Sequence, residues 1–388
     1  MICWQEKSIP QDLKDAIIVT IYKKKGDKAV CGNSRGISLL VVAGKILAKV
    51  MLSRLLKNLA ENILPETQCS FRKDRSTTDM IFVARQLQEK SWEQNRDIYM
   101  AFIDLSKAFD TVSRELLWKL LEKLGIPPTF LTILHQFHEG MRARVQAEGL
   151  QSDPFDVKVG VKQGCVLAPI LFNIFLLAVY LLTHAALGED AGIGIQFRLD
   201  GNLFNIRRLQ ANTKTTLSHI LELQYADDCA IVAHSQCALQ RALDVFHSVY
   251  TSLGLQVNIQ KTEIIAQLVH QPPEPIHFHI NQEPVKIVTQ FTYLGSILSH
   301  TCSIDLEVQS RINRASAAFG RLRARVFSNK NLKVSTKSSV YHAVCVTTLL
   351  YGAETWTPYR RHIKLLEAFH IIVEDIVSCF AFLELEAI

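Results

Sequence analysis

Residues 221–233 read LELQYADDCAIVA, and this stretch decides the fold. Apolar and polar side chains alternate before the acidic pair Asp227 and Asp228, and an apolar run from Ala230 to Ala233 follows it. Alternation with period two is typical of a half-buried strand, and a short apolar run is typical of a fully buried one. The stretch therefore predicts a β-hairpin with two adjacent carboxylates at its tip.

Two adjacent carboxylates repel each other unless a cation neutralises them. Magnesium prefers oxygen ligands, and nucleotidyl transfer uses two such ions about 4 Å apart. Two acids on one tip cannot provide that geometry alone. Asp104, which follows the apolar run Tyr99–Ile103, is expected to bring the third carboxylate from a neighbouring strand. The alternative is an ordinary solvated turn, because Asp is common in turns.

The rest of the chain mixes strand and helix patterns. Residues 16–22 and 37–42 predict a hairpin with a lysine-rich tip, and residues 291–298 predict another. Helical spacing is present at 44–64, at 77–93 and from 303 onwards. A further helix is expected after Asp104, capped by Ser113 and ended by Gly125, Pro127 and Pro128.

No charged residue lies between Gly164 and Gly188, and the part from Cys165 to Leu182 is long and apolar enough for a membrane span. Pro169 interrupts it, however, and no second hydrophobic span follows. We therefore expect a helix buried in a large core and no membrane contact, with a membrane protein as the alternative.

With 388 residues, 48% hydrophobic and 21% charged, the chain is long and apolar enough for a globular protein of two or three domains. The formal net charge of +6 is concentrated. No acidic residue occurs between Glu307 and Glu354, whereas eight basic residues do: Arg311, Arg314, Arg321, Arg323, Arg325, Lys330, Lys333 and Lys337. This favours a phosphate backbone as partner over a solvated helix face, in which acids would be mixed with the bases.

The nine cysteines form no CxxC pair, which indicates reduced thiols in cytoplasm or nucleus. No secretory signal opens the chain, so secretion is not expected. His277 and His279 could bind zinc if two further ligands converged on them, but alternate positions of a short strand are the favoured interpretation.

Several segments in a fixed order resemble the motifs of LINE-type (non-LTR) retrotransposon reverse transcriptases. Five of them resemble motifs A to E: AFIDLSKAFD (101–110), GVKQGCVLAPILFN (160–173), QYADDCAIVA (224–233), GLQVNIQKTE (254–263) and FTYLGSIL (291–298). Two earlier segments, IVTIYKKKGD (18–27) and NSRGISLL (33–40), are similar to the fingers motifs. Three later ones, RINRAS, TLLYGAETW and LEAFH, are similar to the thumb.

The resemblance implies an α+β right-hand polymerase fold with fingers (1–95), a palm of antiparallel sheet backed by helices (96–300) and a basic helical thumb (301–388). It implies RNA-directed DNA synthesis with two Mg²⁺ ions, or Mn²⁺ as an alternative. The implied partners are an RNA template, a DNA primer and deoxynucleoside triphosphates.

The resemblance also assigns roles within the catalytic centre. Asp104, Asp227 and Asp228 become the catalytic metal ligands. Lys261 would donate a proton to the leaving pyrophosphate, with a plain surface lysine as the alternative. Phe109 would block a ribose 2′-hydroxyl and so select deoxynucleotides, with a core phenylalanine as the alternative.

Further roles concern the nucleotide and the primer. Gln163 would contact the incoming nucleotide and the template, with Gly164 allowing close approach. Arg35 and one of three neighbouring lysines would contact the triphosphate. The candidate that we name is Lys25, with Lys23 and Lys24 as alternatives. Tyr293, Leu294 and Gly295 would form the primer grip, which positions the 3′ end.

The chain also departs from the family pattern. It begins almost at the fingers, without the endonuclease domain and the extension that family members carry upstream. After His370 it does not continue the basic thumb pattern, which suggests truncation at the C-terminus. A catalytically inactive, nucleic-acid-binding remnant of such an element is therefore the alternative to an active enzyme.

Overall fold

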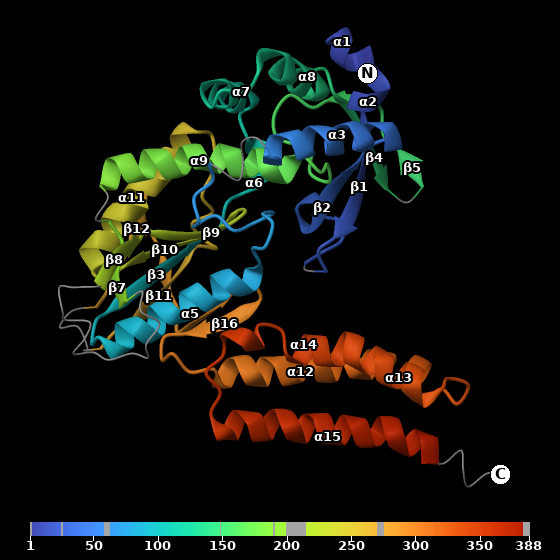
Figure 1. Ribbon diagram of the computed structural model, residues 1–388, viewed down its shortest axis with the longest axis vertical. Helices are drawn as coiled ribbons and strands as arrows, with labels where there is room; N and C mark the ends of the chain where they lie inside the picture. Colours follow the sequence, from blue (N-terminus) through green and yellow to red (C-terminus); the bar gives the residue numbers. More distant parts are fainter. Residues whose placement is uncertain are drawn as a thin grey trace. The chain divides into compact units, whose positions relative to one another are not determined.

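The computed structural model describes residues 2–24, 26–57, 63–147, 149–188, 191–198, 215–269 and 275–382 (Figure 1). Contacts divide the chain into two compact units. The first contains Met1–Ser76, Tyr99–Ile264 and Glu274–Lys286, and the second contains Thr77–Ile98, Ile265–Pro273 and Ile287–Ile388.

The central sheet has the strand order β14-β11-β3-β10-β9. Its strands are β3 (Ile98–Ile103), β9 (Glu222–Tyr225), β10 (Asp228–Ala233), β11 (Glu263–Gln267) and β14 (Lys286–Ile287). β10 pairs antiparallel with both β3 and β9. Every residue of β3 is buried, as expected for an apolar strand covered on both faces. The hairpin predicted around the acidic pair is confirmed.

Helices of the first unit cover this sheet. α9 (Ala168–Leu187) packs against α7 (Arg114–Lys123) and α11 (Gln236–Ser252), and α7 packs against α8 (Pro128–His138). The hydroxyl of Ser113 accepts a hydrogen bond from the Leu116 amide at 3.4 Å, which confirms the predicted cap of α7.

Among the described residues, α9 is the one helix that is long and apolar enough to cross a membrane by length and composition. Core helices of soluble proteins pass the same test, and most of its side chains are buried within the protein. Its contacts with α7 and α11 are those expected of a core helix.

A second sheet in the first unit joins β2, β1, β4 and β5, with β6 beside β4. β1 (Ala16–Tyr22) has the predicted bounds, and β2 (Ser34–Leu39) begins three residues earlier than predicted because Ser34 still pairs with Tyr22. The other strands are β4 (Arg142–Ala147), β5 (Leu150–Gln151) and β6 (Phe155–Asp156). β1 and β4 run parallel.

The remaining elements of this unit are short, apart from α3 (Val42–Leu55). The helix predicted at 44–64 corresponds to α3, and positions 58–62 lie outside the described residues. The short elements are α1 (Ile2–Gln5), α2 (Gln11–Lys14), η1 (Cys31–Asn33), α6 (Ala108–Thr111), β7 (Ile193–Arg198), β8 (Thr215–Ile220), β12 (His279–Ile280) and β13 (Glu283–Pro284). His277 and His279 alternate with the buried Phe278 and Ile280, but only His279 lies within a strand, β12, so the strand interpretation is confirmed for His279 and not for His277.

The second unit contains α5, a hairpin and a group of helices. α5 (Thr77–Glu93) has the predicted bounds, and β15 (Gln290–Tyr293) pairs antiparallel with β16 (Ser296–Ser299) as predicted. The helices are α12 (Asp305–Leu322), the π-helical turns Arg323–Phe327 and Tyr341–Val346, α13 (Val334–Val340), α14 (Thr347–Leu349), the 3-10 turn Ala353–Thr355 and α15 (Arg360–Phe382).

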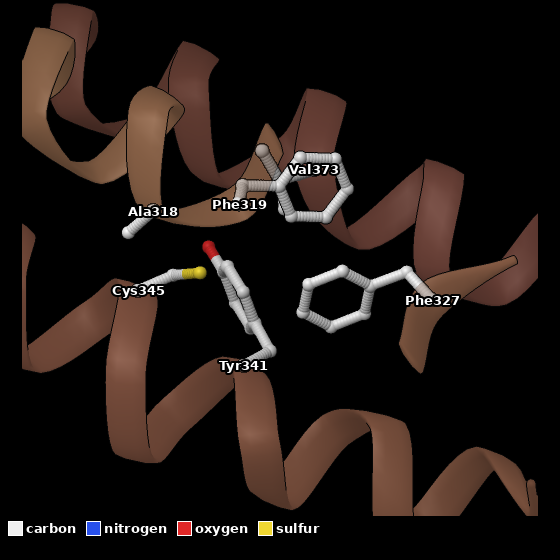
Figure 2. Close-up of a cluster of buried hydrophobic side chains, with 6 residues drawn as sticks. All are labelled: Ala318, Phe319, Phe327, Tyr341, Cys345 and Val373. Atoms are coloured by element: carbon white, nitrogen blue, oxygen red, sulfur yellow. The ribbon is translucent and has the colours of Figure 1, made fainter. Parts of the chain in front are cut away.

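One hydrophobic cluster holds these helices together (Figure 2). Phe319 and Phe327 stack with ring centroids 4.5 Å apart, and the ring of Tyr341 lies beside them. The hydroxyl of Tyr341 shares a 2.9 Å hydrogen bond with Nδ1 of His370, which belongs to α15. The cluster therefore links α12, the two π-helical turns and α15.

Burial corrects the predicted basic surface at two positions. Arg311 and Lys337 are buried, so these two basic side chains cannot contact a phosphate backbone. The other six are exposed: Arg314, Arg321, Arg323, Arg325, Lys330 and Lys333. The sequence showed that eight basic residues are present, but not which of their side chains are buried.

His138, at the end of α8, makes the fold sensitive to acid. Its ring is buried and donates through Nδ1 to the carbonyl oxygen of Leu134 at 3.0 Å. Burial, followed by the charge of Lys162, lowers the pKa of His138 from 6.5 to about 3. The unfolded chain therefore takes up a proton below about pH 6.5 that the folded protein does not accept until about pH 3, so stability falls across this window.

We expect the free energy of unfolding to decrease by about 3 kcal/mol between about pH 7 and pH 4 because of this side chain. His138→Asn, which keeps an N–H donor but does not titrate, should lose that part of the pH dependence in thermal unfolding. His135→Asn, at a partly exposed position of the same helix, should keep it. An unchanged pH profile in His138→Asn would show that the imidazole is not responsible.

Candidate active site

The acidic hairpin is closed by a two-residue turn. Tyr225 pairs with Asp228, so Ala226 and Asp227 are the central residues of the turn. Ala226 has a φ of 54°, in the left-handed region that tight hairpin turns use at their central positions. Asp227 therefore lies in the turn, and Asp228 is the first residue of β10.

The pairing of β3 with β10 brings Asp104 to the same end of the sheet. Cys229 lies opposite Ile103. Because the strands are antiparallel, the next step of this register sets Asp228 opposite Asp104. The register therefore brings Asp104 to the same end of the sheet as Asp227 and Asp228, which lie more than a hundred residues later in the sequence.

The electrostatics of this edge favour a bound cation. Partial desolvation, followed by the negative charges of Asp227 and Asp104, raises the pKa of Asp228 to about 6. Desolvation also raises the pKa of Asp227, and the positive charge of Arg35 partly offsets that effect. A divalent cation would relieve the same repulsion.

The donor set fits magnesium. Carboxylate oxygens are its preferred protein ligands, and it keeps several waters and substrate phosphates in its shell. Among the residues that the structure describes, no group of three or more His, Cys, Asp or Glu side chains lies close enough together to hold a metal ion by itself. A nucleotide-dependent magnesium site does not require one, because water and phosphate complete the shell.

Lys261 lies next to this edge. Its Nζ contacts Oδ2 of Asp104 at 3.3 Å, and both side chains remain partly exposed. The segment that carries it runs beside the end of β3, where the amide of Asn258 donates to the carbonyl oxygen of Asp104 at 2.8 Å. The ammonium group of Lys261 therefore lies beside the first of the three carboxylates.

Gly164 joins the apolar-helix motif to a strand of the second sheet. A side-chain carbon at Gly164 would lie 2.7 Å from the carbonyl oxygen of Ser38 in β2, and its φ is +105°. The Ser38 amide also donates to the carbonyl oxygen of Gln163 at 2.7 Å. The close approach that the glycine allows in this structure is therefore to β2, the strand that carries Arg35.

Phe109 packs against the core on one side. Its ring stacks on that of Phe172 in α9, with centroids 4.3 Å apart and an angle of 23° between the planes. The side chain is half-buried. Both predicted roles, a core phenylalanine and a selective wall beside the sugar, are compatible with this position.

Sequence reasoning missed a hydrogen-bonded chain that supports the acidic turn. Asn173 in α9 donates through Nδ2 to the carbonyl oxygen of Ser70 at 2.7 Å, and the Ser70 hydroxyl donates to Oε1 of Gln68 at 2.9 Å. The same Gln68 oxygen accepts from the Ala226 amide at 3.3 Å. Gln68, Ser70 and Asn173 are all buried. The available signal was a lone Asn within an apolar helix.

The predicted triphosphate lysines are only partly described. Lys23 extends Nζ to the carbonyl oxygen of Gly32 at 3.0 Å, near the end of β1. Lys24 follows with a φ of 56°. Lys25 lies outside the described residues, so its predicted role stays a prediction.

The predicted primer grip forms the turn of the β15–β16 hairpin in the second unit. Tyr293 pairs with Ser296, and the two residues between them have positive φ, 46° for Leu294 and 86° for Gly295. Two positive values are typical of the type I′ turn, whose twist matches that of the flanking strands. Tyr293 itself is buried.

Comparison with known proteins identifies the family. The family model described as "Reverse transcriptase (RNA-dependent DNA polymerase)" matches residues 22–298. The RNA-directed DNA polymerase from mobile element jockey of Drosophila melanogaster is 23% identical over 372 residues, which are 92% of this chain and 37% of that protein. The probable RNA-directed DNA polymerase from transposon X-element of the same species is 22% identical over 378 residues, which are 95% of this chain and 38% of that protein.

The chain thus spans well under half the length of these relatives. Among solved structures, telomerase from Candida albicans in complex with a fragment of telomeric RNA covers 98% of this chain and 62% of its own, with a TM-score of 0.45 and 12% identity. This likeness is too distant to carry an argument.

The mixture of helices and sheets, with β10 antiparallel to both β3 and β9, together with the family match gives the right-hand polymerase fold that the sequence predicted. The chain belongs to the reverse transcriptase (RNA-dependent DNA polymerase) family, and its relatives are the polymerases of LINE-type non-LTR elements. Members of this family generally use divalent metal ions.

Proposed function

We propose that this chain is an RNA-directed DNA polymerase that extends a DNA primer along an RNA template, with release of pyrophosphate. The observation that carries the proposal is the register of β3 against β10, in which Cys229 lies opposite Ile103, so that the next position along each strand pairs Asp228 with Asp104. A site for two magnesium ions explains three carboxylates in this arrangement better than an ordinary solvated turn does.

Asp104, Asp227 and Asp228 would hold the two ions, or Mn²⁺ in their place. Magnesium bound there would activate the primer 3′ oxygen and stabilise the leaving pyrophosphate oxygen. Partial desolvation and the neighbouring charges of Asp227 and Asp104, which raise the pKa of Asp228, support this assignment, because a bound cation would stabilise the charged carboxylates.

Other residues of the first unit would handle the nucleotide. Lys261, which contacts Asp104, would donate a proton to the departing pyrophosphate. Arg35 carries positive charge toward Asp227 and would contact the triphosphate, with Lys25 as the proposed second cation. Gln163 would contact the base pair that is formed, and Phe109 would exclude a ribose 2′-hydroxyl.

The partners follow from the same assignment: an RNA template, a DNA primer and deoxynucleoside triphosphates. We assign the fingers to residues 1–95, the palm to 96–300 and the thumb to 301–388. The six exposed arginine and lysine side chains between Arg314 and Lys333 would contact phosphates of the template and primer without reading their sequence. Tyr293, Leu294 and Gly295 would position the primer end.

Primer extension on poly(rA) with oligo(dT) and magnesium tests the proposal. We expect the unaltered chain to incorporate dTTP, and we expect Asp227→Ala and addition of a chelator each to abolish the product. Binding of the template and primer without extension would contradict the proposed activity. It would favour an inactive nucleic-acid-binding remnant instead.

A further inference from the structure

The turn of the β15–β16 hairpin is held by side chains that bind its two central carbonyl oxygens. The hydroxyl of Tyr351 donates to the carbonyl oxygen of Leu294 at 2.9 Å. Nη2 of Arg311 donates to the carbonyl oxygen of Gly295 at 2.5 Å, and Nη1 of Arg314 donates to the same oxygen at 3.1 Å. Water could satisfy such carbonyls at the tip of a hairpin, so three protein donors point to control of the turn's geometry.

Two of these donors fix each other. The guanidinium of Arg311 lies over the ring of Tyr351, 4.6 Å from its centroid. The same ring is 3.6 Å from the point where a side-chain carbon would begin at Gly295. Tyr351 therefore touches the turn with its ring and binds it with its hydroxyl, while its ring also orients Arg311.

Glu307 closes this network on the other side. Its Oε1 accepts from Nε of Arg311 at 2.7 Å, and its Oε2 accepts from the Ile297 amide at 2.7 Å. Both charged side chains are buried. A buried ion pair adds little net stability, because desolvation offsets the attraction, so its main effect here is on orientation.

Helix α5 binds the hairpin from a second direction. Arg85 donates to the hydroxyl of Ser296 at 2.9 Å and to the carbonyl oxygen of Ile297 at 3.0 Å. The hydroxyl of Thr77, at the start of α5, lies 3.1 Å from that of Tyr351. The strand after the turn is thus anchored independently of the contacts to Leu294 and Gly295.

We propose that Tyr351 and Arg311 are positioning residues that set the backbone of the Leu294–Gly295 turn and, through it, the primer 3′ end. The proposal rests on the function proposed above, in which this turn is the primer grip. Because α5 holds the following strand, loss of a single donor displaces the turn without releasing the hairpin. The expected defect is therefore in the alignment of the primer end and not in the binding of nucleic acid.

The test compares two Tyr→Phe substitutions in the second unit. Tyr351→Phe removes the hydroxyl that binds Leu294 and keeps the ring beneath Arg311. Tyr341→Phe removes a hydroxyl that also makes a 2.9 Å hydrogen bond, but its partner is His370 in the helical core. Tyr341→Phe loses this one hydrogen bond, whereas Tyr351→Phe also loses the contact with the Thr77 hydroxyl, so its melting temperature is expected to equal that of Tyr341→Phe or to lie slightly below it.

The readouts are the single-turnover rate of nucleotide addition and the Kd for template and primer. We expect Tyr351→Phe to lower the rate about tenfold, as a lost hydrogen bond of the stronger kind allows, with Kd changed by less than about twofold. Tyr341→Phe should retain both values. Arg311→Lys, which keeps the charge but cannot serve Glu307 and Gly295 together, should resemble Tyr351→Phe.

An unchanged rate in folded Tyr351→Phe would overturn the proposal, and so would an equal loss in Tyr341→Phe. If Tyr351→Phe fails to fold, Arg311→Lys provides the test, because Arg311 also donates to Gly295 and, being buried, lies outside the proposed phosphate-binding surface. Its rate should fall severalfold at constant Kd, and an unchanged rate again overturns the proposal. Absence of extension by the unaltered chain is a distinct outcome, which rejects the proposed function and this role together.

Discussion

Replacing Asp228 by Asn is expected to lower the rate of primer extension by at least about a thousandfold, because metal-assisted charge stabilisation contributes several kcal/mol. The substitution keeps the size of the side chain and removes its charge. That charge is opposed in the folded protein by Asp227 and Asp104. The free energy of unfolding without divalent cations should therefore not fall. It should rise by up to about 1 kcal/mol, a modest gain because the side chain is partly solvated.

This combination, a large loss of activity with no loss of stability, separates a functional carboxylate from a structural one. Primer extension with magnesium and thermal unfolding in chelator measure the two effects. Asp153→Asn makes the same chemical change in an exposed loop and should alter neither. Retained extension by Asp228→Asn, or a marked drop in its melting temperature, would contradict the metal-ligand assignment.

Gly164→Ala is expected to destabilise the fold by about 3 kcal/mol and to reduce extension at least about tenfold. The new carbon would lie 2.7 Å from the backbone oxygen of Ser38, and the φ of +105° disfavours any L side chain. Neither backbone can yield easily, because the Ser38 amide is bonded to the carbonyl oxygen of Gln163. The strand that carries Arg35 should therefore shift relative to Gln163.

Gly125→Ala is the matched control for this substitution. Gly125 also has a positive φ, +81°, but nothing lies within 4 Å of the position that a side-chain carbon would take. It should show the cost of backbone strain alone, about 1 kcal/mol. The difference between the two variants in denaturant unfolding measures the contact with Ser38. Equal losses would mean that the close approach is unimportant.

The sequence predicted those parts of the fold that local patterns determine. Alternation before the acidic pair located β9, although its polar residues Glu222 and Gln224 are buried as well, and the apolar run after the pair located β10. Helical spacing located α5 with the observed bounds. Ser113 was identified as a cap because capping chemistry acts over only a few residues. Asp104 was matched to the acidic pair because it directly follows one apolar run, whereas the pair directly precedes another.

The remaining features depend on contacts that no local pattern records. The bonds from Asn173 to Ser70 and from Gln68 to Ala226 join residues more than a hundred positions apart. Burial of Arg311 follows from a partner, Glu307, one helical turn away and from a ring in another segment. Composition indicated an excess of positive charge but could not show which charges are neutralised internally.

The chain of polar contacts behind the acidic turn matters for anyone who would redesign this protein. Asn173 is buried within the apolar helix α9 and is not a predicted substrate contact. Hydrogen bonds through Ser70 and Gln68 nevertheless connect it to the amide of Ala226. A mutant library confined to residues around the nucleotide would never sample it. A substitution at this interior position is nevertheless expected to shift the turn that carries Asp227 and Asp228. Such a shift would limit the gain in activity from substitutions nearer the substrate.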